Sequence, residues 1–356
     1  MLDIVIGAGF GDEGKGQTVF DLICDNIFKG NPNDYVIRFN GGHQAGHTVV
    51  FENHRHVFSN FGCGTFKNIP TYWSKFCTVH PLGLLNEHET LTELGYDPVL
   101  YIDPMCPLTL PQDIVLNQTS HGTVGVGFGQ TIQRNEDHFK IYAGDLLNMS
   151  VLKQKISMME KWYYDCDVDM SEFYDNCKEL LSIKNIKIKR PTDIKQPIFE
   201  GAQGILLDQD LGFFPHVTRS KTTACNALQL IKEFNLTDTV LINYVSRTYS
   251  TRHGDGPLNN EDLSDLLDLR DDVIETNEFN EHQGSFRKTI LDIDLLEYSI
   301  KMANLELNDT SIKTRVLFTC SDHHKCDRFF VSYCDRKIKV DVGSLEHFFG
   351  ECNVRY

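Results

Sequence analysis

Short apolar runs rich in β-branched residues recur along the chain, and each ends near a Gly, Asp or Ser. They lie at residues 2–9, 34–40, 98–104, 195–204, 239–247 and 314–322. Apolar runs bounded by such residues are typical of strands that are buried on both faces of a parallel sheet. We therefore expect six buried strands whose carboxyl ends carry loops.

Segments with apolar residues near a spacing of 3.6 lie between these runs, which is the pattern of amphipathic helices. They cover residues 15–28, 150–166, 171–183, 223–235 and 292–303. Alternating strands and helices predict an α/β fold with a mainly parallel central sheet and helices on both faces, in three layers. Repeats and Gly/Ser linkers are absent, so we expect one domain over residues 1–356 with loop or helical insertions at about 105–190. Ligands of such folds bind beyond the carboxyl ends of the strands.

Composition narrows the classes of partner. The 356 residues are 41% hydrophobic and carry a net charge of −16, without a basic run that would bind a nucleic-acid backbone. The N-terminus has no basic, apolar leader, and no segment reaches the roughly 18–20 apolar residues of a membrane span. The 11 cysteines are scattered, as in reduced intracellular proteins. We expect a cytoplasmic protein that binds neither nucleic acid nor membrane.

A glycine-rich loop follows the first predicted strand. From Gly9 it has the Gly-x-x-x-x-Gly-Lys spacing of a phosphate-binding loop, ending at Gly14 and Lys15. Backbone amides and the dipole of the following helix can hold a phosphate there, with Lys15 supplying positive charge. The loop therefore indicates a P-loop-like fold.

Two features separate this loop from related motifs. Gly16 stands where a GTPase switch has a Ser or Thr ligand for Mg²⁺, and Asp12 and Glu13 add negative charge inside the loop. The glycines also fit the dinucleotide fingerprint, but these acids would face a pyrophosphate, and no acidic strand end follows about twenty residues later. We therefore interpret the loop as neither a GTPase switch nor a dehydrogenase motif.

A second loop, after the predicted strand at 34–40, holds His43 and His47 among three glycines. Each ring could be a structural imidazole or a metal ligand, but two histidines on a flexible loop at a strand end favour an acid/base role. Residues 320–326 also gather two Cys and two His, but their spacing fits no common zinc module, so we expect no zinc site there.

Five motifs, in this order, carry a resemblance to a known family: GFGDEGKGQ, GGHQAGHT, FEGAQGILLD, FPHVTRSKTTA and YSTRHGDGP. With them the chain resembles the adenylosuccinate synthetases. The resemblance implies that GTP and IMP bind together, that O6 of IMP is phosphorylated, and that L-aspartate then displaces the phosphate. It further implies a cytoplasmic, Mg²⁺-dependent ligase that is usually a homodimer.

The family's catalytic roles are transferred to matching positions. Asp12 is implied as the general base that takes the N1 proton of the purine, and His47 as the acid that stabilises charge during phosphoryl transfer. Asp12 and the carbonyl of Gly46 are implied as ligands of Mg²⁺. Lys15 and Mg²⁺ would neutralise the transferring phosphoryl group.

Further positions are implied as contacts of the nucleotides. The implied nucleotide- and phosphate-binding residues are Gly11, Glu13, Gly14, Gly16, Gln44, Thr123, Gln203, Thr218 and Asp322. Thr123 lies in a looser match, where Val124 replaces the second Thr of the family. Arg134 is the nearest candidate for the arginine that reaches the nucleotide of the partner subunit.

The segments for L-aspartate and for the donor base both depart from the family pattern. In HQGSFRKTILD the Arg-rich loop is reduced to Arg287 and Lys288, and we expect Arg287, with Ser285, to bind a carboxylate of aspartate. The alternative for Arg287 is a solvated surface cation. The Thr-Lys-x-Asp segment for guanine has become residues 319–322, which keeps Asp322 but loses the Lys, so GTP is favoured and ATP is the alternative.

The chain is short for a bacterial member, and compact archaeal and phage relatives have a similar length. Some phage relatives make the 2-amino analogue from dGMP, with a smaller residue often in place of the base Asp. Because Asp12 is kept, we expect IMP as the substrate. The alternatives are a phage-type synthetase that uses dGMP with ATP or GTP, and a non-catalytic nucleotide-binding regulator.

Overall fold

The computed structural model of the protein describes residues 1–118, 123–163, 168–273, 275, 277, 284–307, 311–349 and 352–354. The chain forms two compact units. The first unit comprises Met1–Thr18 and Gly201–Tyr356, and the second comprises Val19–Glu200. The division falls inside helix α1 (Lys15–Phe28) and inside strand β8 (Ile198–Gly204), so both elements contribute residues to each unit.

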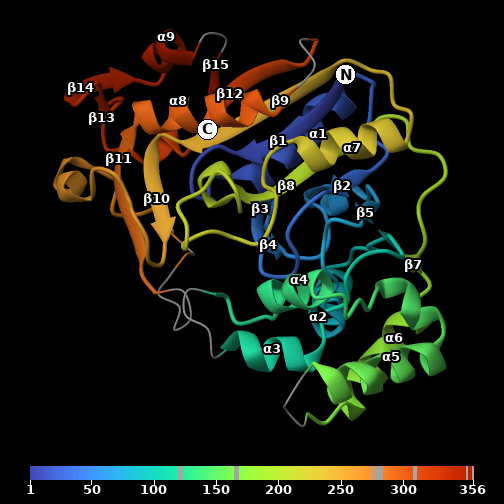
Figure 1. The fold of residues 1–356 in the computed structure, drawn as a ribbon. Helices are drawn as coiled ribbons and strands as arrows, with labels where there is room; N and C mark the ends of the chain where they lie inside the picture. Colours follow the sequence, from blue (N-terminus) through green and yellow to red (C-terminus); the bar gives the residue numbers. More distant parts are fainter. Residues whose placement is uncertain are drawn as a thin grey trace. The chain divides into compact units, whose positions relative to one another are not determined.

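The first unit contains a parallel array in the order β15-β12-β9-β1 (Figure 1). All six residues of β1 are buried, as expected for a strand covered on both faces. The register places Gly7 of β1 beside Val245 and places Thr319 of β12 beside Arg247. The loops that follow these strands therefore emerge at one edge. The strands are β1 (Leu2–Gly7), β9 (Val240–Arg247), β12 (Lys313–Thr319) and β15 (Cys352–Val354).

A second, mixed sheet of the first unit has the order β10-β11-β13-β14. The β10–β11 and β13–β14 pairs are antiparallel, whereas β11 and β13 are parallel. These strands are β10 (Tyr249–His253), β11 (Phe286–Asp292), β13 (Arg328–Tyr333) and β14 (Arg336–Asp341). The helices of this unit, apart from the first turn of α1, are α7 (Cys225–Glu233), α8 (Ile293–Leu305) and α9 (Glu346–Phe349).

The second unit is built on a parallel array in the order β8-β2-β5-β6-β7. Its strands β2, β5, β6 and β7 are short, and β2 pairs with the first half of β8 so that Arg38 lies beside Glu200. A separate antiparallel hairpin joins β3 to β4. The bounds are β2 (Val36–Arg38), β3 (His47–Phe51), β4 (His54–Phe58), β5 (Thr71–Trp73), β6 (Leu100–Ile102) and β7 (Ile186–Ile188).

Helices occupy much of the second unit, and four of them fall within residues 105–190. Helix α2 begins with a proline in its first turn, and the ring of His80 accepts a hydrogen bond from Gly83 N–H as its N-terminal cap. The helices are α2 (Pro81–Glu93), α3 (Pro111–Gln118), α4 (Phe128–Glu136), α5 (Met149–Trp162) and α6 (Ser171–Ser182).

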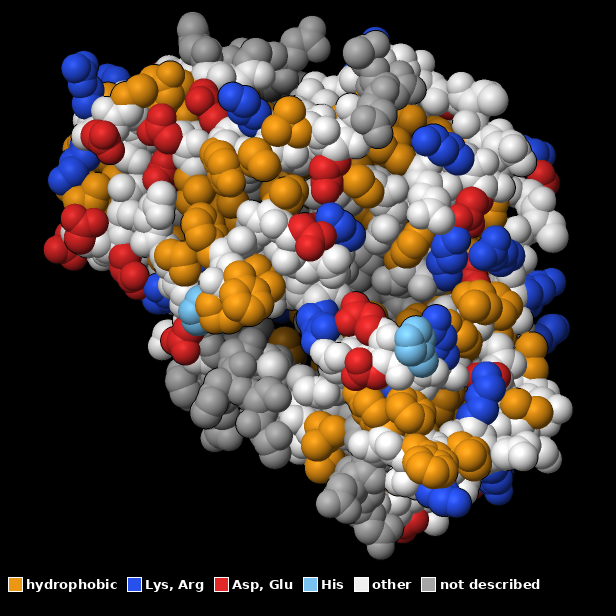
Figure 2. All heavy atoms as spheres, viewed as in Figure 1, with side chains coloured by type: hydrophobic (Ala, Val, Ile, Leu, Met, Phe, Trp, Pro, Cys, Tyr) orange, Lys and Arg blue, Asp and Glu red, His pale blue; other side chains and the backbone are white. Residues whose placement is uncertain are grey.

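These elements confirm an α/β fold with a mainly parallel central sheet. Each of the six predicted strands and five predicted helices has a counterpart, and the helix predicted at 15–28 has those bounds. The last part of the helix predicted at 150–166, residues 164–166, lies outside the described residues. Within the described ranges, no helix is both long and apolar enough to cross a lipid bilayer. Acidic, basic and apolar side chains are interspersed over the face seen in Figure 2.

Candidate active site

The predicted phosphate-binding loop lies between β1 and α1. Its turns require left-handed backbone at Gly11 (φ 89°) and Gly14 (φ 79°), and Asp12 adopts the same region with φ 57°. A Cβ atom on Gly14 would lie 3.2 Å from the side chain of Thr319. Both glycines are therefore needed for the conformation, and Gly14 also for a close contact.

Glu13 places its carboxylate inside this loop. Gly9 N–H donates a hydrogen bond to Glu13 Oε1, and a Cβ on Gly7 would lie 2.1 Å from Glu13 Oε2 and 3.0 Å from Lys15 Nζ. The side chains of Glu13 and Lys15 are both 4% exposed. Burial raises the pKa of Glu13 to about 7, although Lys15 and the Gly9 amide oppose the shift. The Glu13 carboxylate thus accepts a hydrogen bond from the Gly9 amide, which is the kind of donor that a phosphate-binding loop uses to hold phosphate.

Asp12 is only partly exposed and lies among cationic groups. Desolvation raises the pKa of its carboxyl group, while Lys15, Arg247 and His253 act in the opposite direction. A carboxyl group with a raised pKa and nearby cations is suited to accept a proton from a weakly acidic donor.

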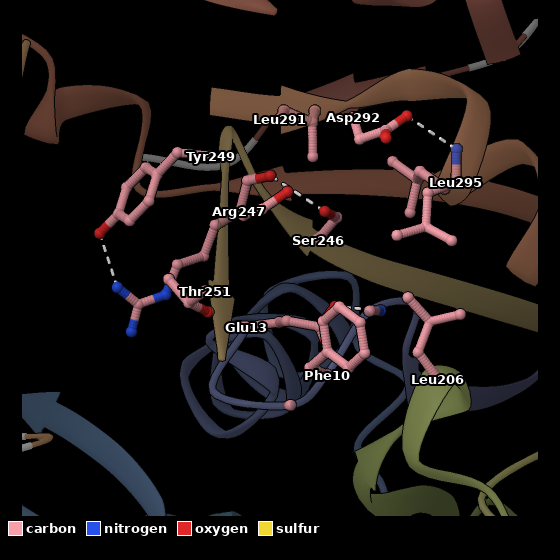
Figure 3. A pocket seen from close by; sticks show the side chains of 14 residues that line it. Phe10, Glu13, Leu206, Ser246, Arg247, Tyr249, Thr251, Leu291, Asp292 and Leu295 are labelled. Atoms are coloured by element: carbon pink, nitrogen blue, oxygen red, sulfur yellow. Dashed lines mark hydrogen bonds between the residues drawn. The ribbon is translucent and has the colours of Figure 1, made fainter. Parts of the chain in front are cut away.

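Arg247 and Tyr249 lie beside the loop, where they line a cavity of about 30 Å³ with Phe10 and Glu13 (Figure 3). Arg247 Nε donates a hydrogen bond to the carbonyl of Asp12, and its Nη1 group donates to Tyr249 Oη at 2.6 Å. A cavity of this volume holds water rather than a nucleotide. Sequence reasoning missed Arg247, whose signal was a basic residue at the carboxyl end of the strand predicted at 239–247.

Two other predicted segments of the first unit contact the loop. A Cβ on Gly11 would lie 3.6 Å from Gln203 Cα, and the buried Oε1 of Gln203 has no protein hydrogen-bond partner. In the segment predicted to read the base, Thr319 Oγ1 donates to the carbonyl of Glu13 at 2.8 Å. Asp322, which follows Thr319 by three residues, is exposed.

Arg287 and Ser285, the residues predicted to bind aspartate, hold the turn at residues 254–256 in the first unit. Arg287 donates to the carbonyls of Gly254 (2.6 Å) and Gly256 (2.8 Å) and pairs with Glu261 at 3.0 Å. Ser285 is exposed, and its carbonyl accepts from the N–H of Gly254. Thr218 lies in another loop, where its N–H donates to the carbonyl of Leu207. A substrate carboxylate at Arg287 would have to displace Glu261.

His47 lies in the second unit, in a buried polar cluster. Its Nδ1 contacts Glu200 Oε1, Arg38 Nη1 lies 3.4 Å from the same oxygen, and Cys63 N–H donates to Glu200 Oε2 at 3.0 Å. Glu200 is fully buried; burial opposes ionisation, but Arg38 and His47 lower its pKa to about 2. Since a carboxylate only accepts hydrogen bonds, Nδ1 of His47 carries the proton.

His47, Cys63 and Glu200 offer ligand atoms within 4.8 Å of one another, but their chemistry does not fit a metal. Burial raises the pKa of the Cys63 thiol well above its usual range, and metals bind the thiolate. Glu200 is already ion-paired with Arg38. We interpret the group as a hydrogen-bonded cluster that orients His47.

The other predicted residues of the second unit lie in several places. His43 packs against His80, with ring centroids 4.9 Å apart and the rings tilted by 32°, and is outside the His47 cluster. Both amide atoms of Gln44 are buried without a hydrogen-bond partner, as expected of a group that binds a ligand. Gly46 is exposed, and Thr123 Oγ1 accepts from the N–H of Gly125.

Arg134 has a structural position. Its guanidinium is fully buried, pairs with Asp113 at 2.9 Å, and donates to the carbonyls of Leu108 and Phe139. These contacts hold α4 against the segments around it. In this arrangement the side chain is not available to a second chain, and we leave it out of the proposed site.

Comparison with known proteins gives one family. The family model "Adenylosuccinate synthetase" matches residues 4–311. The adenylosuccinate synthetase of Hydrogenovibrio crunogenus is 32% identical over 300 residues, which are 76% of this chain and 66% of that protein. That of Buchnera aphidicola is 31% identical over 340 residues, 85% of this chain and 75% of that protein. The chain thus spans about two thirds to three quarters of the length of these relatives.

Solved structures also share the fold of this chain. Fully ligated adenylosuccinate synthetase from Plasmodium falciparum superposes with a TM-score of 0.67 at 21% identity, covering 92% of this chain and 79% of that one. Cyanophage S-2L succinoaminodeoxyadenylate synthetase (PurZ), bound to dGMP and to dATP as an energy donor, superposes with a TM-score of 0.61 at 15% identity. That match covers 91% of this chain and 86% of PurZ.

Proposed function

Because the chain belongs to the adenylosuccinate synthetase family of C–N bond-forming ligases, we propose that it joins L-aspartate to C6 of IMP. GTP is the proposed phosphate donor, and the products are adenylosuccinate, GDP and phosphate. The observation that carries the proposal is Asp12. It is a carboxyl group with a raised pKa in the Gly-rich loop, and Lys15 is among the groups that act on it.

The proposed reaction has two steps. Asp12 takes the proton from N1 of the purine, which concentrates negative charge on O6 and makes that oxygen a nucleophile. O6 then takes the γ-phosphoryl group of GTP, and GDP leaves. In the second step the amine of aspartate attacks C6, the C–O bond breaks, and phosphate leaves with the former O6. His47 and Lys15 stabilise negative charge during the phosphoryl transfer.

The residues fit Mg²⁺. The carboxylate of Asp12 and the carbonyl of Gly46 are hard oxygen donors of the kind that Mg²⁺ prefers. Bound there, the ion would neutralise charge on the phosphates. Asp12 belongs to the first unit and Gly46 to the second. Each is proposed as a ligand from its own donor chemistry and its match to the family.

The remaining assignments follow the same proposal. The amides of Gly11, Glu13, Gly14 and Gly16 bind donor phosphates once the Glu13 carboxylate has left the Gly9 amide. Asp322 accepts from the guanine edge. Gln44, Thr123, Gln203 and Thr218 contact IMP, and Arg287 and Ser285 contact aspartate. The unpartnered amide atoms of Gln44 and the unpartnered Oε1 of Gln203 support their role. By the family we also expect a cytoplasmic homodimer, in which residues 1–356 of each chain form a single domain.

A second candidate is the reaction on dGMP, with ATP or GTP as donor. The fold shared with PurZ favours it, as do the altered base and aspartate segments. Against it stands the retained Asp12, because we expect its carboxyl group to take the space that a 2-amino group would need.

Phosphate release tests the proposal. The protein, GTP, IMP and Mg²⁺ are mixed with and without L-aspartate, and phosphate and adenylosuccinate are measured. We expect both products, in equal amounts, only with aspartate. Phosphate release without aspartate would indicate a GTPase, and no release with any purine monophosphate would favour a non-catalytic regulator.

A further inference from the structure

The backbone of Asp12 needs support from outside the loop. Its φ of 57° lies in the left-handed region, which a residue other than glycine rarely adopts. The side chain leaves from the same Cα, so the orientation of this peptide sets where the carboxyl group points. Groups that hold the carbonyl of Asp12 therefore orient the proposed general base.

Arg247 is such a group. It ends β9, its side chain is 7% exposed, and its Nε donates to the carbonyl of Asp12. The guanidinium is fixed in turn, because Nη1 donates to Tyr249 Oη at 2.6 Å and to Glu275 Oε2 at 2.9 Å. A planar guanidinium held at two points directs its third donor along a defined line, which the flexible ammonium of a lysine does not do.

The same contacts lead to the segment proposed to read the donor base. Tyr249 Oη lies 2.9 Å from His323 Nδ1. Thr248 N–H donates to the carbonyl of Thr319, and Thr319 Oγ1 donates to the carbonyl of Glu13, the residue after Asp12. Consecutive carbonyls of the loop are thus held by the ends of β9 and β12. Figure 3 shows Arg247 and Tyr249 joined beside the loop.

We infer that Arg247 is a positioning residue that fixes the Asp12 peptide for proton abstraction, and that Tyr249 and His323 couple this hold to residues 319–323. The inference rests on the proposed function and goes beyond it, since no motif or comparison assigns a role to Arg247. If binding of the donor base moves His323, the shift would pass through Tyr249 to Arg247 and alter its hydrogen bond to the Asp12 carbonyl. Asp12 would then be oriented for catalysis when the donor base is in place.

Hydrogen exchange of the loop tests this inference without substrate. Backbone amides of residues 8–18 are followed by mass spectrometry in the wild type, R247K and Y249F. R315K is the matched control, because Arg315 is a partly exposed arginine of β12 that lies 3.9 Å from Asp3. We expect exchange in residues 8–18 to be about tenfold faster in R247K, clearly faster in Y249F, and unchanged in R315K.

Unchanged exchange of residues 8–18 in R247K would overturn the inference. If exchange instead rises throughout R247K, the variant has lost global stability. Y249F, which leaves no charge unpaired, then decides: faster exchange confined to residues 8–18 supports the inference, and unchanged exchange there overturns it. In the aspartate-dependent assay, R247K should lower kcat about tenfold or more while KM for IMP changes less than about threefold. An inactive wild type would refute the proposed function, whereas the exchange result would still decide on Arg247.

Discussion

Asp12 occupies a position where phosphate-binding loops ordinarily present backbone donors to an anion. Its raised pKa and its neighbour Lys15 suit a base that works on a bound purine beside a phosphate. The cost is a left-handed residue that the ends of β9 and β12 must hold. At the scale of single residues, then, the backbone of the proposed base is held by distant parts of the chain.

Replacement of the base tests its role. D12N keeps the size of the side chain but cannot accept the N1 proton, so we expect kcat to fall about 10²- to 10⁴-fold at saturating Mg²⁺. Circular dichroism and GDP binding show whether the fold and loop persist. Turnover close to that of the wild type would exclude Asp12 as the general base.

The pH dependence of the free energy of unfolding tests whether Glu200 is paired with Arg38 and His47. The folded-state pKa of Glu200 lies below its usual value of 4.5, at about 2, so its ionised form stabilises the protein above pH ~4.5 and this contribution is lost as pH falls toward 2. The shift corresponds to ~3 kcal/mol. Urea unfolding of wild type and E200Q should therefore differ by roughly this amount at pH 7 and by clearly less at pH 3.5. An equal difference at both pH values would contradict the pairing with Arg38 and His47.

At the scale of elements, buried strands and amphipathic helices could be predicted because their apolar patterns are local. The sheet β10-β11-β13-β14 could not, because strands such as Arg336–Asp341 are mostly polar and give no apolar run. The β3–β4 hairpin was also missed, since its histidines hide the alternation.

The site was predictable only in part, for a related reason. Asp12, Lys15 and His47 stand in local motifs, but the residues that orient them are remote. Arg247 is 235 positions from Asp12, and Glu200 is 153 positions from His47. Only the parallel pairing of strands brings such residues together.

Gly14 tests the loop as an element. G14A adds a Cβ to a residue with φ 79° and presses it against Thr319 at 3.2 Å. We expect GTP affinity to fall about tenfold or more, with a loss of ~1–2 kcal/mol in the free energy of unfolding. G30A is the matched control, because Gly30 has φ 73° and nothing within 4 Å of an added Cβ. If calorimetry shows the same GTP affinity in G14A and the wild type, the loop does not bind the nucleotide as proposed.

At the scale of the whole molecule, the chain has the fold of the family and spans about two thirds to three quarters of the length of the relatives compared by sequence. Its departures from the family pattern lie in the segments proposed to bind the donor base and aspartate, whereas the loop with Asp12 is retained. Because of this combination, both IMP and dGMP have to be compared as the purine substrate.

Competing purines resolve that choice. If Asp12 lies against N1, the 2-amino group of dGMP lacks space, and an unfavourable fit of ~1.4 kcal/mol would lower kcat/KM about tenfold. We therefore expect IMP and dIMP to be used at least about tenfold better than GMP and dGMP, measured side by side with GTP and with ATP. A preference for dGMP would replace the IMP assignment with the diaminopurine reaction.

The fate of a single oxygen atom tests the central claim most directly. IMP labelled with ¹⁸O at position 6 is converted with GTP, Mg²⁺ and L-aspartate, and the released phosphate is analysed by mass spectrometry. If Asp12 makes O6 the nucleophile toward GTP, each phosphate formed carries one ¹⁸O atom and the adenylosuccinate carries none at C6. Unlabelled phosphate would show that water, not the purine, accepts the phosphoryl group, and would contradict the account.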